Sequence, residues 1–127
     1  VDALGGQPGP FSARYGGPGL DDRERLETLL AALEGVPERQ RGARFVCHVA
    51  IASPADDIVS AVGVCSGSIR TRSSGGGGFG YDPVFQPDGE TQTMAELSSC
   101  RKNTISHRAR AFGALARTVE WAQLFPR

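Results

Sequence analysis

Two apolar runs joined by a short turn constrain the fold more than any other part of this sequence. Residues 43–52 alternate apolar side chains along one face, and the opposite face is also partly apolar. Residues 58–64 form a second apolar run, and the residues between the two, 53–57, have the composition of a turn. So short a link favours an antiparallel hairpin. A strand that is apolar on both sides also predicts a sheet that is at least partly covered on both faces.

Helices are predicted on either side of this hairpin. Asp21 and Glu24 have the spacing of a capping box, and leucines then recur at helical intervals until Gly35 and Pro37 end the helix. A final helix is predicted from about Thr104 to Leu124, because its apolar residues also recur at helical spacing. Strands and helices mixed without a repeat predict an α/β or α+β fold, with a mixed sheet flanked by helices. The leucines of the first helix are Leu26, Leu29, Leu30 and Leu33.

Charge and cysteine content narrow the classes of function. Lys plus Arg and Asp plus Glu each total 14, and this balance gives no reason to expect a nucleic-acid or membrane partner. No apolar stretch is long enough to span a membrane, and we expect no signal peptide. Cys47, Cys65 and Cys100 lack metal-ligand spacing, and free thiols fit a reducing cytoplasm. Because the chain starts at Val1 rather than Met, we interpret it as a fragment.

The first candidate site is the glycine-rich segment 73–80 and the residues that follow it. Backbone without side chains can approach a ligand closely, while Phe79 or Tyr81 stacks on a flat base. Asp82 would then orient a polar edge of the base or a metal-bound water. The segment is not a Walker A loop, since no Gly-Lys-Ser/Thr follows. The alternative is a surface loop that leads into a short strand over 82–85, with aromatic side chains in the core.

The second candidate site lies at residues 102–108, where the predicted final helix begins. Lys102, His107 and Arg108 place cations beside backbone amides that already favour an anion, and a phosphate there would accept charge-assisted hydrogen bonds. Lys102 is the only lysine in a chain with 14 Lys and Arg residues, which suggests a need for a compact ammonium group. The alternative is an exposed basic turn without a ligand. Neither a Ser/His/Asp arrangement nor a metal cluster is recognisable.

Segments in the same order and with similar spacing resemble the inosine/xanthosine triphosphate pyrophosphatase family. Each motif alone has little specificity, but a chance match of all of them in register is improbable. The resemblance runs from Val1 to the last helix, so residues 1–127 are interpreted as the C-terminal two-thirds of a single domain whose N-terminal part is missing. The segments are VDALGGQPG at 1–9, SARY at 12–15, GFGYDPVF at 78–85, MAEL at 94–97 and KNTISHR at 102–108.

The resemblance implies both a fold and an activity. The family has a two-lobed α/β fold around a central cleft, usually as a cytoplasmic homodimer. Its members hydrolyse non-standard purine nucleoside triphosphates such as ITP, dITP and XTP to the monophosphate and pyrophosphate, with Mg²⁺. By position, Phe79 would stack on the purine, Lys102 would contact the substrate, and His107 with Arg108 would lie near the base edge and the phosphates. The implied substrate-binding residues are Phe79, Gly80, Tyr81, Asp82, Lys102, His107 and Arg108.

Part of the family pattern has no counterpart in this chain. The phosphate-binding segment, the Mg²⁺ ligands and the general-base aspartate would all lie before Val1, so no catalytic or metal-binding residue is assigned here. We therefore expect the 127-residue chain alone to be inactive and its longer parent to be active. One alternative is a non-catalytic purine-nucleotide-binding module that lacks the metal-binding half. Another is a related pyrophosphatase that acts on modified pyrimidines.

Overall fold

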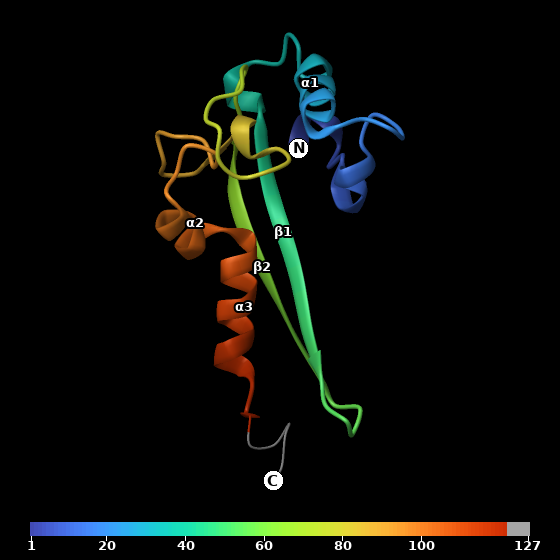
Figure 1. The fold of residues 1–127 in the computed structure, drawn as a ribbon, viewed down its shortest axis with the longest axis vertical. Helices are drawn as coiled ribbons and strands as arrows, with labels where there is room; N and C mark the ends of the chain where they lie inside the picture. The colour runs from blue at the N-terminus through green and yellow to red at the C-terminus, as the bar shows by residue number, and fades with distance from the viewer. Residues whose placement is uncertain (122–127) are drawn as a thin grey trace. The chain divides into compact units, whose positions relative to one another are not determined.

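The structure is a computed structural model that describes residues 1–121 (Figure 1). The chain divides into two compact units, which we call unit 1, with residues 1–44 and 66–98, and unit 2, with residues 45–65 and the segment from 99 onward. Strands β1, Gly42–Ala52, and β2, Ile58–Ile69, each contribute residues to both units. Unit 1 therefore combines the N-terminal residues with the middle of the chain, and unit 2 combines the rest of the hairpin with the C-terminal helices.

Helix α1 of unit 1, Asp22–Ala32, begins at the predicted capping box. The Asp21 side chain accepts a hydrogen bond from the Glu24 amide, and the Glu24 side chain accepts one from the Asp21 amide, both at 2.8 Å. These two contacts satisfy amides that the first turn of a helix otherwise leaves without partners. Beyond the helix the chain turns at Gly35, whose φ of 80° favours glycine. The buried leucines are Leu26, Leu29 and Leu33.

The sheet has three strands in the order β1–β2–β3. The predicted antiparallel hairpin is confirmed, and its turn is closed by the Ser53 amide, which donates to the Asp57 carbonyl at 2.9 Å. Strand β2 extends to Ile69, beyond the predicted run of 58–64. Its last residues pair antiparallel with β3, Phe85–Pro87, in unit 1. The β3 pairing fixes the end of β2, which is where the chain enters the glycine-rich segment.

The predicted strand over 82–85 is wrong for its first three residues. Asp82–Val84 forms a 3₁₀ turn, in which the Val84 amide donates to the Tyr81 carbonyl at 3.0 Å, and β3 starts only at Phe85. Pro83 explains the difference, because proline lacks an amide for a strand ladder and its fixed φ suits the first turn of a helix. A turn follows β3, in which the Glu90 amide donates to the Pro87 carbonyl at 3.1 Å.

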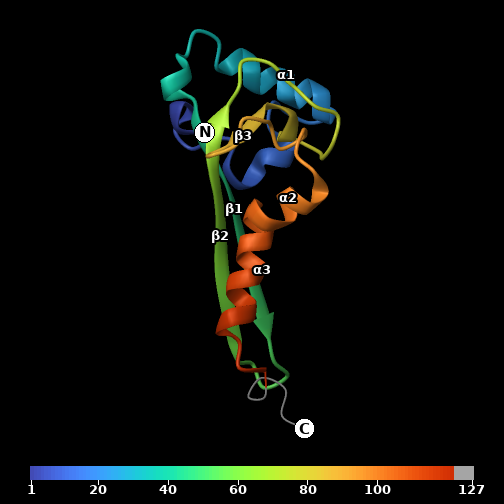
Figure 2. The same cartoon turned by 90° about the vertical axis from the view of Figure 1, so that its left-hand side faces the viewer.

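In unit 2 helix α3, His107–Thr118, packs along one face of the hairpin (Figure 2). The closest approach is at Gly63 of β2, where a Cβ atom would overlap the backbone of His107 and Ala111. Glycine is therefore required for this packing. The opposite face of the hairpin was also expected to be partly covered, but Val46 and Val62 are exposed there, because α3 packs on the other face. The apolar cluster consists of Leu115, Val119, Val49, Ile51, Val59 and Ala61.

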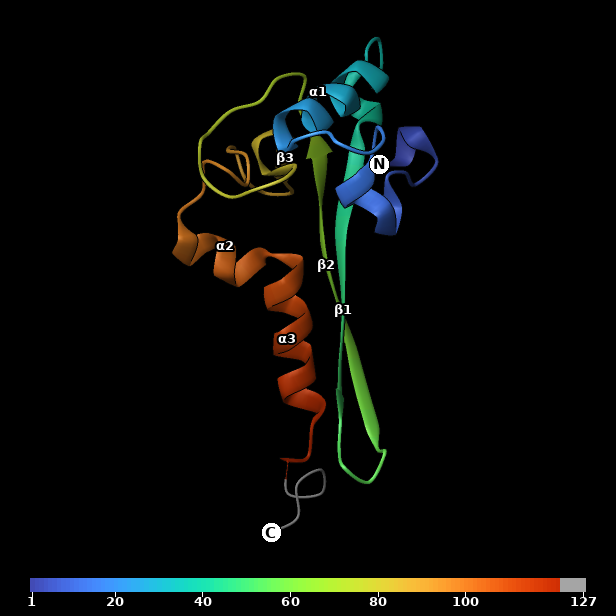
Figure 3. The ribbon, with the colours of Figure 1, turned by 45° about the vertical axis from the view of Figure 1, so that its right-hand side comes forward.

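The prediction of one final helix from Thr104 to Leu124 is wrong. In place of one helix, this part of the chain forms two, α2 at Ser99–Ile105 and α3, and they meet at a steep angle (Figure 3). Ser106 separates them with an extended backbone, φ −62° and ψ 151°, and its side chain accepts from the Ala109 amide at 3.1 Å. Serine favours such caps over helix interiors. The last predicted residues, 122–124, lie outside the described part of the chain.

The three cysteines have free thiols in different environments. Cys65 in β2 is buried, Cys47 in β1 is half-buried and Cys100 in α2 is exposed. Cys65 therefore serves in its strand as a small buried apolar side chain. Within residues 1–121, no helix combines the length and the apolar character needed to cross a bilayer.

Candidate functional site

The glycine-rich segment is an ordered loop hydrogen-bonded to the residues that follow it. The Ser74 amide donates to the Pro83 carbonyl at 2.8 Å, and the Gly77 amide donates to the Ala95 carbonyl at 3.1 Å. The buried Thr93 hydroxyl donates to the Ser74 carbonyl at 2.6 Å. These contacts hold the loop against the MAEL segment, which the sequence comparison had identified only as a motif.

Two glycines of this loop are required by close packing within the protein. A Cβ atom at Gly77 would lie 2.8 Å from the Ala95 carbonyl oxygen, and one at Gly75 would lie 2.8 Å from the Glu96 amide nitrogen. A Cβ atom at Gly76, by contrast, would meet nothing within 4 Å. The absence of a side chain at Gly75 and Gly77 therefore lets the loop pack closely on residues 95 and 96 of the same chain. The sequence had suggested instead that the glycines allow close approach to a ligand.

Phe79 and Tyr81 point to different environments. The Phe79 side chain is 68% exposed and so presents an aromatic face to solvent. Tyr81 is half-buried, and its hydroxyl donates to the Ser12 carbonyl at 2.6 Å. Burial raises the pKa of Tyr81, so the hydroxyl keeps its proton and remains a donor. The stacking candidate is thus Phe79, while Tyr81 ties the loop to the 3₁₀ turn Gly9–Arg14.

Asp82 and the Gly80 amide make contacts within unit 1. The Asp82 carboxylate accepts from the Phe79 amide at 3.4 Å, and the Asp82 amide donates to the Phe79 carbonyl at 3.2 Å. The Gly80 amide donates to Asp22 Oδ2 at 3.4 Å, so the turn also touches the first residue of α1. Asp82 was expected to orient a ligand group, and its contact with the Phe79 amide shows that it also shapes the turn that displays Phe79.

Arg41 is a buried cation that the sequence analysis missed. Arg41 is only 3% exposed, and its side chain donates hydrogen bonds to backbone carbonyls. Nη1 donates to Leu33 at 2.8 Å, Nε donates to Ile69 at 2.8 Å, and Nη2 donates to Arg70 at 3.1 Å. A guanidinium group suits this position because the carbonyls at the end of a helix carry partial negative charge. A signal was present, since Arg41 is in phase with the buried positions of β1, beginning with Ala43.

Helix α1 is consequently linked to the chain on both sides of the glycine-rich segment. At its C-terminal end, Arg41 joins the Leu33 carbonyl to those of Ile69 and Arg70, shortly before the segment. At its N-terminus Asp22 accepts from the Gly80 amide, where the segment ends. Contacts at both ends restrict the loop more than either contact alone. The helix therefore acts as a strut, by which we mean that its contacts at both ends restrict the movement of the turn that carries Phe79.

Lys102, His107 and Arg108 lie around the junction of α2 and α3. Lys102 is half-buried in the last turn of α2, not at the start of the final helix as predicted. His107 opens α3, and its ring stacks on Phe45 with centroids 5.0 Å apart and planes at 19°. Arg108 is exposed in the first turn of α3. The two residues His107 and Arg108 keep the predicted position at a helix N-terminus, and Lys102 does not.

Comparison with known proteins assigns the family. The family described as the Ham1 family matches residues 1–118. This chain belongs to the Ham1 family. A relative from Shouchella clausii named dITP/XTP pyrophosphatase is 48% identical over 120 residues, which cover 94% of this chain and 61% of the relative. One of the same name from Streptomyces avermitilis is 50% identical over 119 residues, covering 94% and 60%.

Solved structures of Ham1-family proteins share the fold of this chain. The Ham1 protein of Staphylococcus aureus matches with a TM-score of 0.86 and 39% identity over 92% of this chain and 60% of that one. A protein of Mycobacterium abscessus titled nucleoside-triphosphatase / dITP/XTP pyrophosphatase gives 0.78 and 44%, covering 91% and 60%. The predicted α/β class, a sheet flanked by helices, is therefore confirmed. This Ham1-family chain spans about three-fifths of the length of the relatives that it matches.

The predicted site residues of this Ham1-family chain fall into two sets. Phe79, Gly80, Tyr81 and Asp82 come together in unit 1, whereas Lys102, His107 and Arg108 come together in unit 2. That both sets meet on one purine nucleotide, in a cleft between two lobes, stays a prediction.

The described residues of the Ham1-family chain contain no cluster of metal-binding side chains. Among residues 1–121, no group of three or more His, Cys, Asp or Glu side chains lies close enough together to hold a metal ion. Near the candidate site, Asp22 pairs with Arg25 at 3.0 Å and Asp82 accepts from the Phe79 amide. The substrate-binding roles of residues 79–82, 102, 107 and 108 and the metal ligands before Val1 both stay predictions.

Proposed function

We propose that the protein to which this chain belongs hydrolyses non-standard purine nucleoside triphosphates, such as ITP, dITP and XTP, to the monophosphate and pyrophosphate. The observation that carries this proposal is the 48–50% identity, over nearly the whole chain, to relatives named dITP/XTP pyrophosphatase. Because the chain covers about 60% of those relatives, the activity is proposed for a longer protein. We propose that this chain is the C-terminal two-thirds of that protein.

In this proposal the turn after the glycines binds the base. The exposed ring of Phe79 stacks on the purine, and Gly80, Tyr81 and Asp82 shape the surrounding pocket. The contacts of the turn with Asp22 and Ser12 support this role, because they hold the aromatic ring in place before a ligand arrives. Such preorganisation reduces the entropy lost on binding.

The junction of α2 and α3 binds the polar parts of the same nucleotide. Lys102 contacts the phosphates, and His107 with Arg108 donates hydrogen bonds to the base edge and the phosphates. Hypoxanthine and xanthine carry a keto oxygen where adenine carries an amine, so donors placed at that edge would be left without acceptors by adenine. A site built around such a hydrogen bond rejects the wrong base strongly. Guanine has the same oxygen and must be excluded through its extra amine.

We further propose that Mg²⁺ ligands and a general-base aspartate lie upstream of Val1. The share of the relatives that this chain covers, about 60%, supports a longer protein in which such residues can lie. Bound Mg²⁺ would neutralise phosphate charge and help to activate water. We also propose that the protein is a cytoplasmic homodimer, and the three free cysteines support a reducing compartment.

A substrate panel tests this function. The purified longer protein, with Mg²⁺, is expected to release pyrophosphate from ITP and XTP much faster than from ATP or GTP. Equal rates for ATP and ITP would contradict the role given to the base edge. Preference for a modified pyrimidine triphosphate would instead support the related pyrophosphatase that the sequence left open. Binding of ITP without cleavage would instead favour a non-catalytic purine-nucleotide-binding module.

A further inference from the structure

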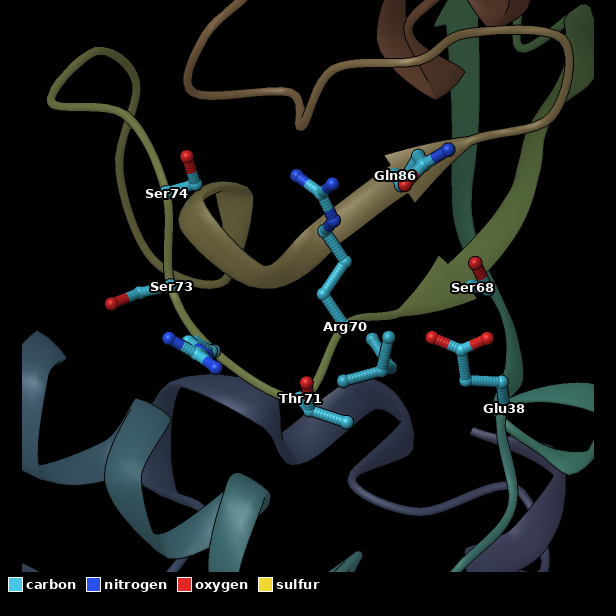
Figure 4. A pocket seen from close by; sticks show the side chains of 9 residues that line it. Glu38, Ser68, Arg70, Thr71, Ser73, Ser74 and Gln86 are labelled. Carbon is cyan, nitrogen blue, oxygen red and sulfur yellow. The ribbon is translucent and has the colours of Figure 1, made fainter.

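A hollow in unit 1 lies where β2 ends and the chain enters the glycine-rich segment (Figure 4). Its volume is about 530 Å³, enough for a small phosphorylated molecule. None of the residues 79–82 lines it, so it is separate from the proposed base site. Its walls come from the end of β2, residues 70–74, β3 and the 3₁₀ turn Glu38–Gln40.

The residues that line the hollow include two arginines, one carboxylate and several hydroxyl groups. Arg70 extends between Ser74 and Gln86 in Figure 4, and its Nη1 donates to the Glu96 carboxylate at 3.3 Å. Arg72 adds a second, exposed guanidinium group. The lining contains a single carboxylate, Glu38, which lies beside Ser68 in the same view. Further hydroxyl groups come from Ser68, Thr71 and Ser73.

The charge of Glu96 does not depend on Arg70 alone. Its carboxylate accepts from the Thr93 amide at 2.9 Å. This contact is the main reason that the pKa of Glu96 is lowered, with smaller contributions from hydrogen bonds to the side chains of Thr93 and Ser74 and from the charge of Arg70. Because other donors already stabilise the carboxylate, Arg70 can share its remaining N–H groups with an anion in the hollow.

The backbone on both sides of the Arg70 side chain is held in place. The Arg70 amide donates to the Val84 carbonyl at 2.8 Å, and the Arg70 carbonyl accepts from the buried Arg41 side chain at 3.1 Å. A charged side chain on a fixed backbone loses less entropy when it binds a ligand. The residue that aims into the hollow is therefore preorganised.

We propose that this hollow is an anion site that binds the phosphate group of a small phosphorylated molecule through Arg70 and Arg72, with the neighbouring hydroxyls. Guanidinium forks and hydroxyl groups match the oxygens of phosphate, and the anion lies on the arginine side, away from Glu38. The site is independent of the proposed hydrolysis, because it uses none of the residues assigned to base or substrate binding.

Titration with inorganic pyrophosphate tests the site in the 127-residue chain. Backbone amide NMR signals, followed at constant ionic strength, are expected to shift mainly at residues 68–74 and Gln86. We expect the dissociation constant for pyrophosphate to rise about tenfold in Arg70→Gln and in Arg72→Gln, because each variant loses one charge-assisted contact. The Arg70 variant also loses the contact with Glu96, which can disturb the fold. Arg72 is exposed, so we expect the Arg72 variant to stay folded and to test the site by itself.

The matched control is Arg117→Gln, which removes the same charge from an exposed position of α3 in unit 2. It is expected to leave pyrophosphate affinity unchanged. An equal loss in the Arg117 and Arg72 variants would show general charge attraction and would overturn the proposal, as would shifts centred outside the hollow. No nucleoside triphosphate is used, so a negative result leaves the proposed hydrolysis untouched.

Discussion

Phe79 owes its proposed role to exposure, since its ring is 68% exposed on a turn that its neighbours hold in place. In the longer protein, Phe79→Ala is expected to weaken substrate binding by about 1–3 kcal/mol, because stacking on a base contributes that much. The Michaelis constant for ITP, measured beside that of Phe112→Ala, checks this. Phe112 is a suitable control because it is 55% exposed on α3 and has no assigned role. An unchanged Michaelis constant in the Phe79 variant would count against stacking.

Lys102 and Arg108, the basic residues of the candidate site in unit 2, can also be tested one residue at a time. Lys102→Ala and Arg108→Ala in the longer protein are each expected to lower kcat for ITP on the order of 100-fold, as removal of a donor to developing charge commonly does. Thermal unfolding should remain close to wild type. Arg117→Ala provides a basic, exposed control on the same helix as Arg108. Wild-type turnover in both site variants would refute their assignment.

At the scale of elements, the glycine loop depends on how closely it packs on the MAEL segment. Gly77→Ala places a Cβ atom 2.8 Å from the Ala95 carbonyl oxygen, so we expect it to lower the free energy of unfolding by about 1–3 kcal/mol. Gly76→Ala, whose Cβ meets nothing within 4 Å, is expected to be neutral or slightly stabilising. Urea denaturation of both variants makes the comparison, and equal effects would mean that the packing at Gly77 is not limiting.

The strut formed by α1 depends on Arg41. Arg41→Met leaves buried carbonyls without their donor and is expected to cost roughly 3 kcal/mol of unfolding free energy. Arg41→Lys keeps the charge but not the fork, and we expect an intermediate loss. Hydrogen exchange at the Gly80 amide should also speed up in the Met variant. The control is Arg39→Met, at an exposed position two residues away. An equal loss of unfolding free energy in this variant would show that the buried contacts of Arg41 are not what stabilises the fold.

At the scale of the whole molecule, the 127-residue chain is expected to release no pyrophosphate from ITP with Mg²⁺. The reason is that residues 1–121 contain no metal-binding cluster, so neither charge neutralisation nor water activation is available from them. A coupled assay for pyrophosphate, with the longer protein as positive control, measures this. Mg²⁺-dependent hydrolysis by the purified chain would contradict this expectation.

The sequence predicted what depends on neighbouring residues. The capping box of Asp21 and the hairpin around 53–57 are local signals, and both are confirmed. The Ser106 break was missed because apolar residues continue at helical spacing through it. The environment of Arg41 was missed because its partners Ile69 and Arg70 lie 28 and 29 residues away. The residues of the candidate site were identified as motifs, but only the structure shows which of them hold the turn.

Ser106 also changes what the basic residues around it can reach. In one continuous helix, side chains six positions apart point about 120° away from each other around the axis, so Lys102 and Arg108 would point in different directions. The bend between Ser99–Ile105 and His107–Thr118 removes that angular constraint, since each residue now follows its own axis. The relative direction of these two positive charges therefore depends on the break at Ser106.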